Sequence, residues 1–240
     1  MKKIFPTMLK IVVFTTAIWV FVYFLDGKMG NLPLQTSQSL FSYYPDPEIA
    51  SLAEKASMTD KAKSIFYAAN PVIDSDRTTF ETHCQTPISS NAVELGCYTS
   101  DNHIYILRIT QPQLVNEMVV VASHEMLHAV YAISPSSQKT SVNAVLEAEF
   151  PDVRNRELTH ELRNYRVREP GQRDNELHSI IGTEYSPLST DLETYYAQYF
   201  TNRATIVSYA KHFKGVFSQL EGTLSSLAAQ IKQLRQQMRI

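Results

Sequence analysis

The chain carries no surplus of charge of either sign. Its 22 basic and 24 acidic residues give a formal net charge of −2 at pH 7. A protein that binds nucleic acid through the phosphates needs a basic field on its surface. Because the sequence offers no such field, we expect no nucleic-acid partner.

Cysteine is scarce, and the only two are Cys84 and Cys97. In an exported domain, a pair that closes a short loop most simply forms a disulfide, which stabilises the fold by about 3 kcal/mol. The alternative is a second metal site that adds His83 and His103 to the two cysteines. That spacing fits no zinc-ligand pattern, so the sequence favours the disulfide.

The sequence also lacks the small residues in an A-x-A arrangement that a signal peptidase would need after Leu25. Residues 4–25 form an apolar segment whose single charge is Lys10, and this segment is long enough to span a bilayer as a helix. Since lysines cluster at its start, the positive-inside rule leaves the N-terminus in the cytoplasm and exports the rest. We predict an uncleaved, single-pass anchor over residues 1–26; the alternative is a secreted protein released by signal cleavage.

One motif carries chemistry: His124-Glu125-Met126-Leu127-His128. On a helix, positions i and i+4 share a face, so the two imidazoles can bind one Zn²⁺ while the glutamate between them faces a water on the metal. The bland alternative is an ordinary amphipathic helix with two histidines and a glutamate on its polar side.

Apolar residues recur at helical spacing on both sides of this motif. They are Leu114, Val115, Met118, Val119, Ala122, Met126, Ala129 and Val130. Pro112 can open the helix, and Ser134-Pro135 ends it. We therefore predict a largely buried helix of about six turns around the motif.

A catalytic zinc site needs a third protein ligand and an open position for water. In the HExxHxxGxxH class, a glycine and a histidine follow the second histidine by three and six residues. This chain has Tyr131 and Ser134 at those positions, which excludes the class. We expect a carboxylate from a later helix instead, and the candidates are Glu176, Glu184 and Glu193.

The segment Asn175-Glu176-Leu177-His178-Ser179 resembles the N-E-x-x-S segment of thermolysin-like zinc metallopeptidases, the gluzincins. The resemblance covers this segment and the HExxH helix. It implies that Glu176 is the third zinc ligand and that the small Ser179 lets its helix approach the motif helix closely. The aspartate that follows the serine in that family is replaced by Ile180, which leaves open the partner that orients a histidine. Glu184 is the candidate for that role, or for the ligand itself.

The wider chain resembles membrane-anchored bacterial HExxH proteins. The segments that carry this resemblance are MTDKAKSIFY, LGCY, HIYIL, HEMLHAVY and ELHSIIGTE. It implies a protein of the bacterial cell membrane with an extracytoplasmic catalytic domain, and it indicates no substrate.

The rest of the chain predicts a mainly α fold with a small β-sheet, an α+β arrangement of the zincin type. Residues 27–46 are rich in turn-forming residues and are assigned to a stalk, and residues 47–204 to the metallopeptidase domain. Helical spacing covers residues 47–69, with a separate helix beginning near Thr59. Residues 104–109 are the clearest strand. It is either the edge strand that zincins use to hold a peptide or part of a small structural hairpin.

Further helices are expected after the motif. They cover residues 138–169 with a break at Phe150-Pro151, a segment capped by Asp174, and residues 188–199.

Residues 205–240 form a C-terminal helix of a different kind, with apolar residues spaced alternately by four and three. They are Phe213, Phe217, Leu220, Leu224, Leu227, Ile231, Leu234 and Met238. This heptad spacing is typical of a coiled coil. We predict a coiled-coil partner or a homo-oligomer through residues 213–238; the alternative is a terminal helix packed on its own domain.

These features predict a zinc peptidase that cleaves peptide or protein substrates. In this hypothesis His124, His128 and Glu176 hold Zn²⁺, which lowers the pKa of a water, and Glu125 is the general base. The oxyanion needs a further donor, and the candidates are His178, Tyr185, Tyr195 and Tyr196. One alternative is a membrane-tethered interaction protein with a structural or degenerate zinc site and a coiled-coil partner helix. Another is a metal hydrolase that acts on other bonds.

Overall fold

The computed structural model describes residues 44–85, 94–155, 158–159, 162–163 and 171–238. The predicted anchor and nearly all of the predicted stalk lie outside the described residues. Internal contacts divide the chain into Met1–Tyr44 and Pro45–Ile240, and the described helices and strands belong to the second unit. Within the described ranges, no helix combines the length and the apolar character needed to cross a membrane.

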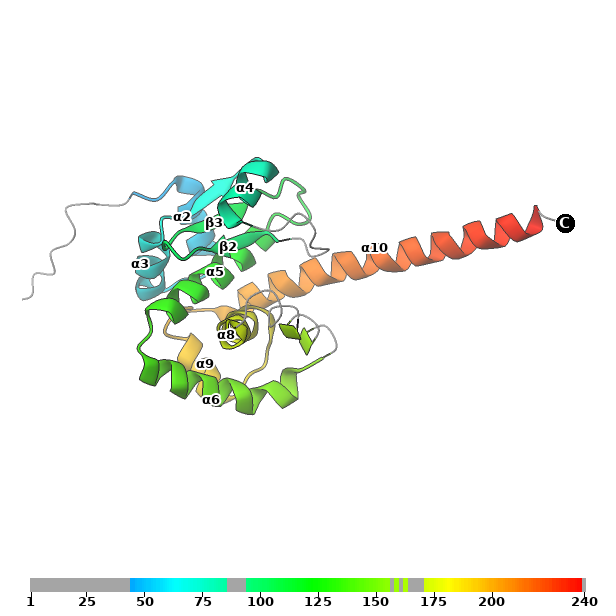
Figure 1. The fold of residues 1–240 in the computed structure, drawn as a ribbon. Coiled ribbons are helices and arrows are strands. Elements are labelled where there is room, and N and C mark those ends of the chain that lie inside the picture. The colour runs from blue at the N-terminus through cyan, green and yellow to red at the C-terminus, as the bar shows by residue number, and fades with distance from the viewer. Residues whose placement is uncertain (1–43, 86–93, 156–157, 160–161, 164–170, 239–240) are drawn as a thin grey trace, which may run out of the picture. The chain divides into compact units, whose positions relative to one another are not determined.

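The described part is mainly helical with a three-stranded sheet, as the sequence predicts (Figure 1). The helices are α2 (Pro47–Lys55), α3 (Asp60–Ala68), α4 (Arg77–Cys84), α5 (Glu117–Ile133), α6 (Ser136–Val153), α8 (Arg173–Glu184), α9 (Thr190–Tyr196) and α10 (Arg203–Gln237). The strands are β1 (Val72–Asp74), β2 (Gly96–Tyr98) and β3 (Ile104–Leu107).

The predicted helical region 47–69 is two helices, and the expected second start near Thr59 is confirmed. Asp46 caps α2 by accepting a hydrogen bond from the backbone N–H of Glu48, and Thr59 caps α3 in the same way through Ala62. Each side chain satisfies an N–H group that the first helical turn leaves without a partner. Between the helices, Ser57 has a left-handed φ of 53° that turns the chain.

The sheet has the order β1-β3-β2, with β1 parallel and β2 antiparallel to β3. Ile104 and Ile106 of β3 are fully buried, and the strand contacts α5. The idea that residues 104–109 form the edge strand is therefore wrong, because β3 is the central strand. In the described sheet the outer strand beside α5 is β2.

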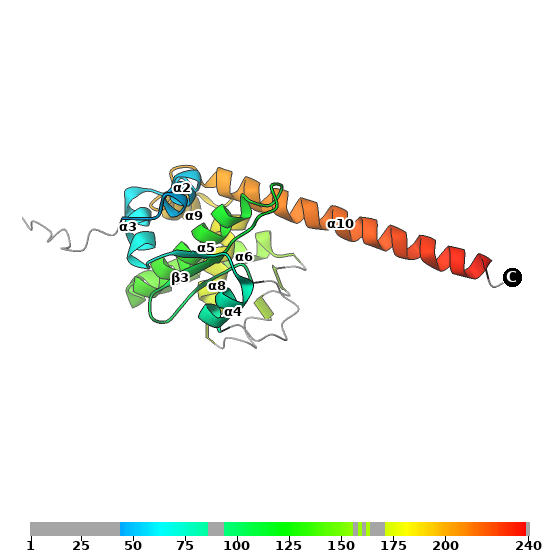
Figure 2. The same ribbon diagram turned by 90° about the horizontal axis from the view of Figure 1, so that it is seen from above.

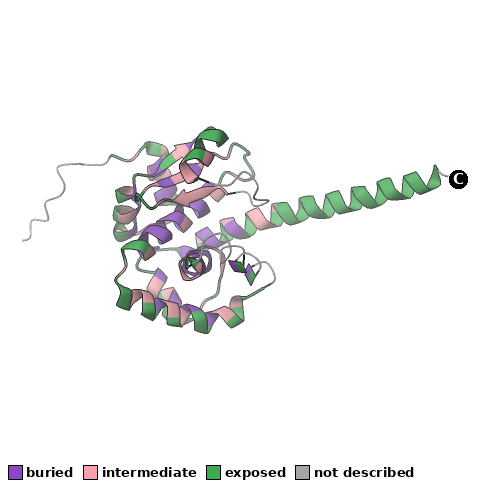
Figure 3. Cartoon of the chain, viewed as in Figure 1, coloured by how far each residue is buried: buried purple, intermediate pink, exposed green. Residues whose placement is uncertain are grey.

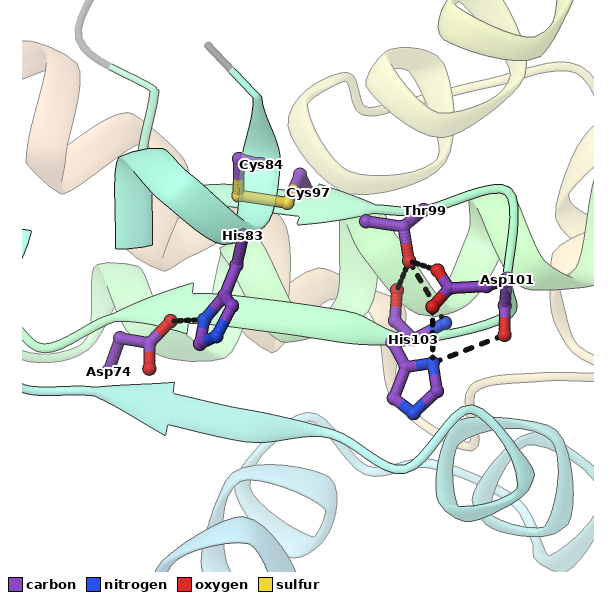
Figure 4. The surroundings of a disulfide bond; sticks show 7 residues. All are labelled: Asp74, His83, Cys84, Cys97, Thr99, Asp101 and His103. Atoms are coloured by element: carbon purple, nitrogen blue, oxygen red, sulfur yellow. Dashed lines mark hydrogen bonds and ion pairs between the residues drawn. A yellow bond between two sulfur atoms is a disulfide. The ribbon is translucent and has the colours of Figure 1, made fainter. Parts of the chain in front are cut away.

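Cys84 and Cys97 form the predicted disulfide, with a Cα–Cα distance of 5.8 Å (Figure 4). The bond joins the end of α4 to β2. It also excludes the alternative of a metal site that uses both cysteines. His83 lies beside the bond and pairs through Nδ1 with Oδ2 of Asp74 at 2.9 Å.

The motif helix α5 lies between the sheet and α8, and it contacts both (Figures 1 and 2). It begins at Glu117, later than expected from Pro112, because residues 112–116 form turns with i→i+3 bonds such as Glu117 N to Leu114 O at 2.9 Å. Its end at Ile133, followed by an extended Ser134, agrees with the sequence. Most of its residues are buried, as predicted.

Two later expectations need correction. Helix α6 continues through Pro151 to Val153. The proline lies in the last turn, and the helix still closes beyond it through a hydrogen bond from the N–H of Arg154 to the carbonyl of Phe150. Asp174 does not cap α8, since the helix begins one residue earlier. Its carboxylate instead pairs with Arg173 at 2.8 Å and accepts a hydrogen bond from Asn143 at 3.1 Å.

Helix α10 has two different halves. Its first turns pack on α5 and α8 through buried Ile206, Val207 and Ala210. From Ser218 onward every described residue is exposed, as the green ribbon of Figure 3 shows. Packing on its own domain therefore accounts for the start of the helix and leaves most of the heptad row in solvent.

The crossing of α5, α8 and α9 has no spare volume at Gly182. A methyl group there would lie 2.5 Å from Cδ1 of Leu127 and 2.7 Å from Cε1 of Tyr196, both fully buried. We expect Gly182→Ala to lower the free energy of unfolding by about 1–3 kcal/mol through overpacking. Urea denaturation of the full chain measures the change.

Gly222→Ala is the matched control, since nothing lies within 4 Å of a methyl group at Gly222 on exposed α10. There the higher helix propensity of alanine should stabilise by up to about 1 kcal/mol. Equal effects of the two substitutions would contradict the close crossing.

Candidate metal centre

Three side chains from two helices converge beside the sheet. His124 and His128 lie one turn apart on α5, and Glu176 lies in the first turn of α8. Nε2 of His124 is 3.7 Å from Oε2 of Glu176, and Nε2 of His128 is 3.5 Å from its Oε1. The ligand atoms all lie within 4.8 Å of one another, so the group can hold a metal ion. Within the part of the chain that the structure describes, no other such group occurs.

The donor set fits a divalent metal. Two imidazole nitrogens and one carboxylate oxygen suit transition metals such as zinc, and three protein ligands leave a coordination position open. His128 is 7% exposed and Glu176 is 4% exposed, so these donors are shielded from water. The side chain of His124 is 17% exposed, which keeps one side of the group accessible.

A neighbour of Glu176 orients His128. Oδ1 of Asn175 lies 3.0 Å from Nδ1 of the imidazole, and Oγ of Ser179 lies 3.3 Å from the same atom. An amide oxygen only accepts, so Nδ1 carries the hydrogen and the lone pair of Nε2 points to the site. The sequence left this partner open. The polar residue next to Glu176 in the sequence, Asn175, could have identified this partner.

The charges around the histidines favour a cation. Burial lowers the pKa of His124, but the nearby Glu176 carboxylate and the charges of Glu125 and Glu184 outweigh burial and raise this pKa to about 9. Burial lowers the pKa of His128. The two imidazoles therefore face a concentration of carboxylate charge that a bound cation would neutralise.

Glu125 lies between the two histidines and is 6% exposed. Strand β2 passes directly over it: a methyl group on Gly96 would be 2.9 Å from Oε1 of Glu125 and 2.3 Å from Cγ1 of Val121. Only glycine permits this close approach. The glutamate is thus held against the strand that borders the site.

The group opens into a cleft of about 430 Å³. One side is formed by β2 and the turn after it, and the others by α5 and by the starts of α6 and α8. His124, Glu125, His128 and Glu176 all line it. The candidate general base and the candidate metal ligands therefore line one and the same cleft.

The other two candidate carboxylates lie outside the metal group. Oε2 of Glu184 is 2.7 Å from Nζ of Lys214, so it connects α8 to α10. Glu193 accepts a hydrogen bond from Nε of Arg203 at 3.1 Å. The negative charge of Glu184 still contributes to the raised pKa of His124.

None of the four oxyanion-donor candidates lines the cleft. His178 is fully buried, its Nε2 is 2.9 Å from the hydroxyl of Tyr195, and burial lowers its pKa to about 3, so it is neutral. The hydroxyl of Tyr196 donates to the carbonyl of His178 at 2.7 Å, and that of Tyr185 accepts from Asn155 at 3.2 Å.

The tyrosines that do line the cleft are Tyr98 and Tyr131, which sequence reasoning missed. Tyr131 follows His128 by three residues and so shares its helix face, which is a signal present in the sequence. Tyr98 reaches the cleft because β2 pairs with β3, and this pairing is long-range.

The contact of Asn175 with His128 predicts an effect on metal affinity. Asn175→Ala removes the acceptor that fixes the imidazole, and we expect the affinity for Zn²⁺ or Co²⁺ to fall by about 10–100-fold. Competition with a chromophoric chelator measures it. Asn175→Asp keeps an acceptor oxygen and should retain tight binding. Asn202→Ala, at an exposed position, is the control, and equal affinities of the two alanine variants would refute the orienting role.

In comparisons with known proteins, no family model, no curated protein and no solved structure matches the chain. Function is therefore inferred from the geometry and chemistry of the site.

Proposed function

We propose that the protein is a zinc-dependent peptidase of the thermolysin-like type, anchored in the bacterial cell membrane with its catalytic domain outside the cytoplasm. The observation that carries the proposal is the convergence of His124, His128 and Glu176 within 4.8 Å. Glu125 lies between the two histidines and lines the same cleft. Two histidines and a glutamate are the ligand set of thermolysin-like catalytic zinc.

A bound zinc ion would supply the Lewis acidity that activates water and polarises a carbonyl group. Glu125 supplies the acid–base chemistry: its carboxylate accepts a proton from the attacking water and returns one to the departing amine. Glu125 directly follows His124 in the sequence, and the close approach of β2 limits the space around its carboxylate.

The fold beside the site favours a peptide as substrate. Gly96, Cys97 and Tyr98 of β2 all line the cleft, while β2 pairs with β3 on its other side. An extended peptide can add to such an outer strand through backbone hydrogen bonds. Backbone pairing of this kind would bind an extended peptide and not a small molecule. The arrangement therefore supports peptide hydrolysis over hydrolysis of a small molecule.

Two features support the location. Residues 4–25 are apolar and preceded by lysines, as an N-terminal anchor with a cytoplasmic N-terminus requires. The disulfide between Cys84 and Cys97 fits a domain outside the cytoplasm, because disulfides persist in oxidising compartments.

The test uses full-length protein in detergent, supplied with Zn²⁺, and a mixture of internally quenched peptides. We expect wild type to hydrolyse members of the mixture. Glu125→Gln should retain zinc and lose about 10²–10⁴-fold in kcat, the range for loss of a general base. Glu176→Ala should lose both zinc and activity.

Glu221→Gln is the matched control, because this carboxylate lies on the exposed half of α10; its activity should equal that of wild type. Wild-type turnover by a zinc-containing Glu125→Gln protein would contradict the mechanism. Loss of zinc in Glu184→Ala, with zinc retained in Glu176→Ala, would contradict the ligand assignment.

A second candidate function is a membrane-tethered interaction protein that binds a coiled-coil partner or a second copy through residues 213–238. The observation that favours it is the exposed apolar row on α10. Phe217 is 44% exposed, Leu224 65% and Ile231 51%. The two functions are compatible within one chain.

The heptad row predicts opposite results for neighbouring substitutions. Leu227→Asp places a charge in the row and should abolish association, measured by sedimentation of the detergent-solubilised full chain or by cross-linking to its partner. Ser226→Asp places the same charge one residue away, outside the row, and should leave association unchanged. Equal association of the two variants would contradict a role for the row.

A further inference from the structure

We propose that Lys139 forms a carboxylate-binding subsite in the cleft and gives the enzyme a preference for peptides that carry a negative charge two or three residues from the cleaved bond. The inference rests on the proposed peptidase function and names the substrate class of the same site.

The position of the ammonium group is defined by two contacts. Lys139 lies near the start of α6 and lines the same cleft as the metal-binding group. Its Nζ donates to the carbonyl of Ala132 at 3.3 Å and lies 5.1 Å from the ring centre of Tyr131. Both partners belong to the last turns of α5, just beyond His128.

These contacts indicate how far the ammonium group of Lys139 lies from the metal-binding group. Ala132 follows His128 by four residues, which is about 6 Å along a helix axis. An extended peptide advances roughly 3.3 Å per residue. For a substrate chain that runs alongside α5, the ammonium group is therefore about two or three residues from a peptide bond held at the metal group.

Within the described residues, the charge of Lys139 has no partner of opposite sign. Among these residues, no acidic side chain forms an ion pair with it, and it is the one lysine or arginine that lines the cleft. The cleft also holds the acidic side chains of Glu94, Glu125 and Glu176. Among the described residues, Lys139 is thus the one side chain of the cleft that offers a positive charge to an anionic group of a substrate.

The start of α6 adds to this positive field. The helix has no acidic residue in its first turn and no side-chain cap, and the N-terminal end of a helix carries partial positive charge. Helix stability alone disfavours a lysine at this end. One of the three ammonium hydrogens is used by Ala132, so two remain for an incoming anion.

The matching ligand is a carboxylate, which a peptide can supply from an aspartate or glutamate side chain or from its C-terminus. A purely structural role is the competing explanation, in which Lys139 only satisfies a carbonyl at the end of α5. The two explanations differ in one observable: only the first makes substrate charge matter.

The experiment compares matched peptides with the full-length zinc protein. Each peptide has Glu or Gln at one position within three residues of the cleaved bond, and each is made with a free or an amidated C-terminus. We expect kcat/KM to favour one acidic form by about tenfold, as for a hydrogen bond to a charged group. The position or terminus at which the preference appears identifies the source of the carboxylate.

Lys139→Met, whose side chain is similar in length and uncharged, should remove this preference. It should leave kcat/KM unchanged for the peptide that has Gln at the tested position and an amidated C-terminus. Lys139→Glu should invert it, and Lys139→Arg should preserve it, which separates charge from folding. Lys211→Met, at an exposed position on α10, is the control and should behave as wild type. Absence of a preference in wild type, or its persistence in Lys139→Met, would overturn the proposal.

A binding measurement separates this inference from the proposed function. In the Glu125→Gln background, fluorescence anisotropy with labelled acidic and amide peptides reports affinity without turnover. Tighter binding of the acidic peptide that disappears with Lys139→Met supports the subsite even if no hydrolysis is found. The subsite is rejected if the acidic and amide peptides bind equally, or if neither binds, even when wild type is an active peptidase.

Discussion

The crossing of α8 over α5 is the constraint on which the rest of the structure depends. The helices approach closely because Gly182 and Ser179 are small where they face α5, with Leu127 and His128 on the other side. Without that approach, Glu176 would not reach within 3.7 Å of His124. The apolar faces of α5 supply the rigidity, since this helix contacts the sheet, α2, α3, α8 and α10. The same close helix crossing therefore packs the core and brings Glu176 to the two histidines.

The electrostatics of the centre work against folding. Burying a carboxylate with two imidazoles removes hydration that their mutual attraction repays only partly. The structure keeps the arrangement ordered through hydrogen bonds: Asn175 and Ser179 hold His128. A neutral apolar cluster would be the simpler solution for a core at this place. That the chain retains a buried charged group at the border of a cleft argues that the group serves binding or chemistry.

The sequence predicted what depends on local spacing. His124 and His128 share a helix face because they are four residues apart, and the segment around Glu176 resembles a ligand helix. It did not predict features that depend on tertiary pairing. Strand β2 is short and weakly apolar, so its place at the cleft follows only from its pairing with β3. Lys139 enters the cleft because α6 folds back after Ser134, which no periodicity in the chain reveals.

The first turns of α10 connect its exposed half to the helix that carries part of the candidate metal centre. Arg203 donates to the carbonyls of Gly182 at 3.3 Å and Tyr185 at 2.6 Å, where α8 ends. About three turns later, Lys214 pairs with Glu184 of α8. In a continuous helix, backbone hydrogen bonds fix each turn relative to the turn before it, so the two ends of the helix keep a defined relative position. A partner bound to the heptad row would therefore be held in fixed relation to α8, the helix that carries Glu176. If the proposed assembly through α10 and the proposed catalysis at the cleft both occur, they would share one rigid element of the structure.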